Sequence, residues 1–239
     1  MKDSSFSRWM GPVGLLAVVA IFVGFGPLGG GSPDENASGV TVANWYNSHV
    51  GQSWGSIYAV SIGAALLVVY LVHLRTVLRQ TSGESLLPNV AFFASVLLLA
   101  GLMVSGVDQV VLILAAHNHQ FAIAHSANFI SNNDEFGLVF GMALLTLSTG
   151  LCILVHRRAP LPRTLGWYSV LVAIVSCAGP LSGLAFLFGL PIWVIATGFV
   201  ITVKARRGTL GPSSAAGAPS RAAVENSSTF PSVGEPATT

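Results

Sequence analysis

Asp108 and Gln109 are the polar residues whose position most directly suggests chemistry. They interrupt an apolar stretch, with apolar runs at 88–107 and 110–116 on either side. A carboxylate inside a membrane segment is costly and often marks a proton relay or a contact with a cation or polar ligand. Asp108 nevertheless lies about 30 Å along a helix from Pro88, where a carboxylate could simply be solvated at the interface. The sequence leaves both interpretations open.

Three further polar residues belong with this acid. Asn44 and Asn128 hold the same place in two related motifs, ANWYNSH at 43–49 and ANFISNN at 127–133, and His125 stands just before the second. If the two asparagines converge near Asp108, the motifs would form the lip of a binding site. The candidate ligand or proton residues are therefore Asp108, Gln109, Asn44, Asn128 and His125.

Other titratable side chains give no metal or catalytic pattern. Metal-ligand types gather toward the ends of the apolar blocks, at His49, His117, His119, His125, Asp134 and Glu135. On a continuous helix His117 points away from Asp108, and no HExxH or paired-cysteine motif is present. His73 and His156 could pair as haem ligands, but both lie beside arginines at helix ends, where histidine also complements the helix dipole. We therefore expect no metal, no cofactor and no catalytic residue.

The composition assigns these residues to a membrane protein. Of 239 residues, 52% are hydrophobic and only 8% are charged, whereas a soluble domain carries about 25% charged residues. The net charge of +2 is better interpreted by position than as a sum, so no nucleic-acid partner is indicated. The lipid bilayer is the expected partner, a small solute is possible, and the oligomeric state is left open.

The apolar residues form blocks of roughly the 20 residues that cross a bilayer as a helix. The unbroken tract 165–203 is too long for one span and is divided at the Gly and Pro residues of 179–183. The first block lacks an A-x-A cleavage site, which favours an uncleaved helix. The prediction is an all-α, six-helix transmembrane bundle over 12–203, between an N-terminal tail 1–11 and a disordered tail 204–239. Its approximate spans are 12–28, 54–74, 89–110, 136–156, 164–181 and 184–203.

Every lysine and arginine falls in the two tails or in the connections after the second and fourth spans. By the positive-inside rule both termini and these connections are cytoplasmic, and loops 29–53 and 116–135 face outward. The expected location is the plasma membrane, here the bacterial inner membrane.

Both outer loops carry apolar residues at helical spacing. These are Val40, Ala43, Tyr46 and Val50 in the first loop and Phe121, Ala124, Ala127 and Ile130 in the second. We expect two amphipathic helices on the membrane surface, with Trp45, Tyr46, Trp54 and Phe129 at headgroup level. The repeated motif is also compatible with an internal duplication.

Small residues at helical spacing predict close helix packing in the bundle. Gly137 and Gly141 form a GxxxG pair, and Gly101 with Ser105 has the same spacing. Cys152 and Cys177 lie at different depths and are expected to pack as free thiols.

The acidic DEN at 34–36 followed by ANWYNSH, together with LPRTLGW at 161–167, resembles an uncharacterised family of six-span bacterial integral membrane proteins. The resemblance covers roughly 12–204 and implies a fold and a location, but no substrate or catalytic residue. Three functions remain. The first is a non-enzymatic sensor or scaffold with an outward recognition surface. The second is a small-solute or proton-coupled carrier using Asp108, and the third is a membrane enzyme using the outer His and acidic residues.

Overall fold

The computed structural model describes residues 6–80, 85–133, 137–156, 159, 161–179 and 181–208 in full, and the backbone alone of 81–82, 136 and 180. Over this part of the chain the protein is helical, without strands. The main helices are α2 (Met10–Val23), α3 (Gly39–Ser48), α4 (Val50–Ser82), α5 (Leu87–His117), α6 (Phe121–Asn133), α7 (Phe136–Val155), α8 (Arg163–Ser176) and α10 (Leu190–Arg206). Short π-helices follow α2 (η1, Gly24–Leu28) and precede α10 (η3, Ala185–Gly189), and the turn between α8 and η3 holds η2 (Gly179–Leu181) and α9 (Ser182–Leu184).

Long apolar helices give the chain the architecture of a multi-pass membrane protein. Within the part of the chain that the structure describes, five stretches are long and apolar enough to cross a bilayer: Met10–Leu28, Val50–Gln80, Leu87–His117, Phe121–Val155 and Ser182–Arg206. The expected span 164–181 is shorter than predicted, because α8 ends at Ser176 after 14 residues. The predicted turn is confirmed at Gly179–Leu181, where Gly179 has a φ of +59°, a conformation that favours glycine.

Helices α4 and α5 are longer than the predicted spans 54–74 and 89–110. They contain 33 and 31 residues, so they are about 50 and 46 Å long, against about 30 Å of hydrocarbon. The predicted span 89–110 stopped at the interruption by Asp108 and Gln109, although the apolar run resumes to Ala116, and α4 continues past its apolar run into the largely polar segment 75–82. Roughly 15–20 Å of each helix is therefore available to project from a membrane.

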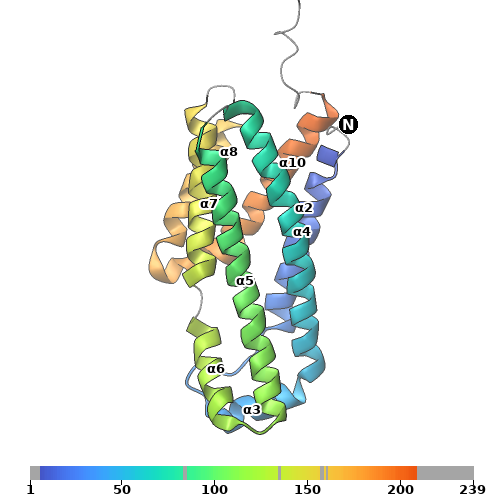
Figure 1. Ribbon diagram of the computed structural model, residues 1–239, viewed down its shortest axis with the longest axis vertical. Coiled ribbons are helices and arrows are strands. Elements are labelled where there is room, and N and C mark those ends of the chain that lie inside the picture. The colour runs from blue at the N-terminus through green and yellow to red at the C-terminus, as the bar shows by residue number, and fades with distance from the viewer. Residues whose placement is uncertain (1–5, 83–84, 134–135, 157–158, 160, 209–239) are drawn as a thin grey trace, which may run out of the picture.

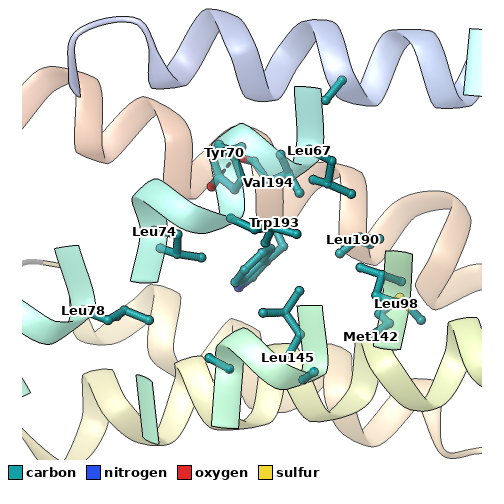
Figure 2. Packing of buried hydrophobic residues seen from close by; sticks show 14 of the residues in the cluster. Leu67, Tyr70, Leu74, Leu78, Leu98, Met142, Leu145, Leu190, Trp193 and Val194 are labelled. Atoms are coloured by element: carbon teal, nitrogen blue, oxygen red, sulfur yellow. Dashed lines mark hydrogen bonds between the residues drawn. The ribbon is translucent and has the colours of Figure 1, made fainter. Parts of the chain in front are cut away.

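The core of the spanning region is formed by α2, α4, α5, α7, α8 and α10. Figure 1 shows the first and last helices side by side at one end of the molecule, and Gly11 N donates to Thr202 Oγ1 at 2.8 Å. Trp193 is fully buried in this core, and Figure 2 shows it among Tyr70, Leu74 and Leu145.

Buried hydroxyl groups add a polar chain through the spanning core. Tyr70 Oη donates to Thr197 Oγ1 at 2.5 Å, and Trp193 Nε1 donates to Ser169 Oγ at 2.7 Å. Ser169 Oγ in turn donates to the Leu165 carbonyl at 2.7 Å. These bonds join α4 to α10 and α10 to α8, satisfying polar groups that would be costly in hydrocarbon.

The two outer loops are helical, as predicted. The expectation that Ala43, Tyr46, Ala124 and Ala127 face the membrane is wrong, whereas Val40, Phe121 and Ile130 are 40–52% exposed. Tyr46 is only 1% exposed, and Val42 and Ala43 are fully buried. They form a second core with Leu112, Ile113, Ala115, Ala116, Ala124 and Ala127 of α5 and α6. The projecting end of α5 supplies a nearer apolar partner than lipid does. Helices α3 and α6 with this end of α5 are called the cap below, and Figure 1 shows it at the end opposite the N-terminus.

The start of α3 follows from local sequence. Ser38 is its N-cap, and its side chain accepts a hydrogen bond from Thr41 N at 3.2 Å. This bond satisfies one of the N–H groups left open at a helix start. The cap thus has both a local initiation signal and a non-local core.

Candidate functional site

Gln109 is a structural link between three helices of the cap. Its amide oxygen accepts a hydrogen bond from Tyr46 Oη at 3.2 Å, and its amide nitrogen donates to Ser131 Oγ at 3.4 Å. Asn47 Nδ2 adds a bond to the Ala116 carbonyl at 3.1 Å. The side chain of Gln109 therefore fixes α3 and α6 against α5.

Asn128 and His125 hold the loop that precedes α3. Asn128 is 1% exposed, and its Nδ2 donates to the Asp34 carbonyl at 2.8 Å. His125 Nδ1 donates to the Ala37 carbonyl at 2.9 Å. Both bonds tie α6 to the loop, so these two candidates lie together on one side of the cap.

Asn44 does not occupy the position that Asn128 does. It lies on the exposed side of α3, whereas Asn128 is buried on α6. The two motifs thus form similar helices but place their matching asparagines in different environments. Neither asparagine lines the groove that contains Asp108.

Asp108 lines an open groove between α5 and α6 with a volume of about 350 Å³. The groove is bordered by Asp108, Val111, Ala122, Ile123, Ser126, Ala127 and Ile130. Asp108 is half-buried, with its Oδ2 atom enclosed, while Ile123 and Ile130 are about half exposed. A single carboxylate between apolar walls suits a ligand that combines a positive or hydrogen-donating group with an apolar body.

The groove contains Asp108 but not Asn44, Gln109, His125 or Asn128. Sequence reasoning missed Ser126, which brings a hydroxyl to the same groove. Its helical spacing with Ala122 and Ile130, at i, i+4 and i+8, was the signal that could have revealed it.

Three further histidines have local partners in the structure. His49 stacks on Trp45 with ring centroids 4.5 Å apart, His73 meets Phe6 edge to face at 5.6 Å, and His156 Nδ1 donates to the Cys152 carbonyl at 2.9 Å. Among the described residues no three His, Cys, Asp or Glu side chains gather as a metal site would require. Asp134 and Glu135, placed by sequence in the first turn of the fourth span, lie outside the described residues.

Tyr46 gives the cap a predicted pH dependence. Burial raises the pKa of its phenol to about 12, against a smaller lowering effect of the Gln109 hydrogen bond, whereas an unfolded tyrosine has a pKa of about 10. The unfolded state therefore loses its proton first, so cap stability is constant below pH 10 and falls by roughly 2–3 kcal/mol as the pH rises to 12.

The absorbance of the phenolate reports the titration of Tyr46 and tests this prediction. Subtracting the alkaline titration of Tyr46→Phe from that of the wild type isolates Tyr46, and the difference curve is expected to have its midpoint near pH 12. A midpoint near 10 would show that Tyr46 is not buried in the cap.

Comparison with protein-family models, with curated proteins and with solved structures finds no match.

Proposed function

We propose that this protein is a non-enzymatic sensor or scaffold of the bacterial inner membrane that recognises a ligand or partner in the Asp108 groove. The observation that carries the proposal is the cap itself: two helices pack on the projecting end of α5 and leave a groove with one carboxylate between apolar walls. A helical structure built outside the bilayer, with an open groove, suits recognition.

Charge placement supports a six-span topology with both termini in the cytoplasm and the cap outside. Segments 29–53 and 107–133 contain no lysine or arginine, while Arg75, Arg79, Lys204 and Arg206 lie toward the opposite end. Positive residues remain on the cytoplasmic side of a membrane. In this topology α8 and the turn that follows it form the fifth span.

The groove favours a cationic or amine-bearing ligand with an apolar body. Asp34, Glu35 and Asp108 are the charged residues of the described outer segments 29–53 and 107–133, so the field there is negative and would concentrate cations. Ile123 and Ile130 then contact the apolar part of the ligand while Asp108 bonds its polar group.

Asp108→Asn tests this recognition. A photo-crosslinking amino acid at Ile130 is expected to give ligand adducts in intact cells, and Asp108→Asn is expected to reduce them about tenfold, because a charge-assisted hydrogen bond contributes about 1.5–3 kcal/mol. The same crosslinker at Asn44, exposed on α3 and outside the groove, is the control. Equal adducts at the two positions, or adducts unaffected by Asp108→Asn, would contradict the proposal.

A small-solute or proton-coupled carrier is the second candidate. It is favoured by the enclosed Oδ2 of Asp108 near the outer end of an apolar helix. It is weakened because no other Asp or Glu occurs in the described residues of the spanning helices, whereas coupled carriers place their sites near the midplane. Under this alternative Asp108→Asn abolishes proton-coupled uptake.

A further inference from the structure

A second hollow lies in the spanning region and is lined by apolar residues. Its volume is about 190 Å³, and residues of α2, η1, α4, α5, η3 and α10 line it. Leu67, Leu98 and Val194 form a buried floor, while Phe22, Leu187 and Phe188 at the rim are about half exposed. The cavity therefore opens sideways from the bundle, toward the surface that would face lipid.

Two helices give consistent estimates of its depth. Val18 and Gly26 lie about 12–24 Å from Met10 along α2 and η1, and Leu98 and Leu102 lie roughly 16–23 Å from Leu87 along α5. Both starting points are at the end that carries the arginines. In a hydrocarbon core of about 30 Å, the cavity thus belongs mainly to the outer leaflet.

Two π-helices face each other across this cavity, and proline accounts for their position. Pro27 lies inside η1, and Pro191 is the second residue of α10, two positions after η3 ends at Gly189. Proline lacks the N–H that would continue α-helical bonding, and wide π turns often accompany functional sites. Phe25 of η1 meets Phe186 of η3 edge to face, with centroids 5.7 Å apart. These two rings connect the walls of the cavity.

We propose that this cavity binds one acyl chain of an outer-leaflet phospholipid. The proposal rests on the membrane embedding proposed above. An apolar cavity of about 150 Å³ stays free of water and binds apolar molecules, and an unfilled one leaves its lining without dispersion contacts. A helix of another protein, about 10–12 Å across with its side chains, does not fit a hollow of 190 Å³. A segment of one extended hydrocarbon chain, which is much narrower than a helix, does.

Gly26 allows the cavity to be filled without disturbing the fold. It lines the cavity, and an added Cβ would meet only Phe22 Cε1, at an ordinary 3.8 Å. Gly26→Phe is therefore expected to place its ring in the acyl-chain site. Gly106→Phe is the matched control, since a Cβ at Gly106 meets nothing within 4 Å and Gly106 is not part of the cavity lining.

The test uses the full chain reconstituted in phosphatidylcholine vesicles that carry a photoreactive diazirine near the middle of one acyl chain. Mass spectrometry of the irradiated protein is expected to find labelling concentrated on the peptides that hold Phe22 and Phe188. Gly26→Phe is expected to reduce that labelling at least fivefold, and Gly106→Phe to leave it unchanged.

Unchanged labelling of these peptides in Gly26→Phe would overturn the inference, as would wild-type labelling no greater there than on lipid-facing residues elsewhere. Phe93 and Phe199, exposed on α5 and α10, report membrane embedding separately. If they are labelled while the cavity is not, only the acyl-chain site fails. If no spanning helix is labelled, the proposed membrane topology fails as well.

Discussion

Gly141→Ala is expected to destabilise the bundle by about 2–3 kcal/mol, because overpacking a close contact typically costs 1–3 kcal/mol or more. Gly141 lies where α7 crosses α5, and a Cβ there would stand 2.7 Å from the Leu98 Cα atom. The neighbouring group is backbone and cannot rotate away. The two helices would have to separate, and the contacts between them would be lost together.

Gly137→Ala is the matched control for this substitution. Gly137 is the other glycine of the same GxxxG pair, but a Cβ there would lie 3.7 Å from the Gly101 Cα atom, an ordinary contact. We expect a change of less than 0.5 kcal/mol, typical of substitutions that meet no packing constraint. Comparing the two variants separates the general effect of replacing glycine in a helix from the steric clash between residue 141 and the backbone of α5.

The reactivity of a buried thiol measures the thermal stability of both variants. Cys152 is buried on α7, while Cys177 is exposed. In a Cys177→Ser background, the reaction of a maleimide fluorophore with Cys152 reports unfolding as the temperature rises. Gly141→Ala should lower the midpoint by several degrees and Gly137→Ala should not. Equal midpoints for the two variants would contradict the close approach at Gly141.

These glycines illustrate how far the sequence determines the packing. The GxxxG spacing correctly predicted that α7 approaches another helix closely, and Gly101 is confirmed at the facing position, where a Cβ would lie 2.7 Å from Leu138 N. Spacing could not show which glycine of the pair is constrained. That difference depends on where α5 crosses α7, which is a property of both helices together.

The outer helices show the same limit. Helical periodicity predicted α3 and α6, because their apolar residues recur on one face. It could not show whether that face meets lipid or protein, since both are apolar. The answer depended on how far α5 continues past Gln109. Helix α5 reaches His117, and its last turns provide the apolar partner.

The candidate site was only partly accessible to sequence reasoning for a related reason. Asp108 was found from its unusual surroundings, and the structure places it in a groove. Asn44 and Asn128 share a motif, yet only Asn128 is buried. Burial depends on the register of each helix against α5, and a motif of seven residues does not encode that register.

Trp193→Ala is expected to be the most destabilising substitution in the spanning core, at about 3 kcal/mol or more, as for other large aromatic residues replaced by alanine. Trp193 is fully buried, lies among residues of α4 and α7, and bonds to Ser169 of α8. In a bilayer the unfolded reference is also apolar, so burial itself contributes little. The cost comes from lost dispersion contacts around the cavity that the indole leaves.

Trp193→Phe separates packing from hydrogen bonding. It keeps most of the aromatic volume but removes the Nε1 bond to Ser169. Ser169 Oγ would still donate to the Leu165 carbonyl, so no buried hydroxyl would lose its only partner. A bond between membrane helices contributes on average about 0.6 kcal/mol, and Trp193→Phe should therefore cost about 1 kcal/mol, well below the alanine variant.

The Cys152 reactivity assay measures the stability of both Trp193 variants. Adding Ser169→Ala, alone and together with Trp193→Phe, completes a double-mutant cycle. If packing dominates, the coupling energy between the two positions stays below about 1 kcal/mol. Should Trp193→Phe cost as much as Trp193→Ala, the hydrogen bond would be the main contribution instead. The association of α8 with α10 would then depend mainly on one hydrogen bond, and apolar packing would contribute less to it than the buried face of α8 suggests.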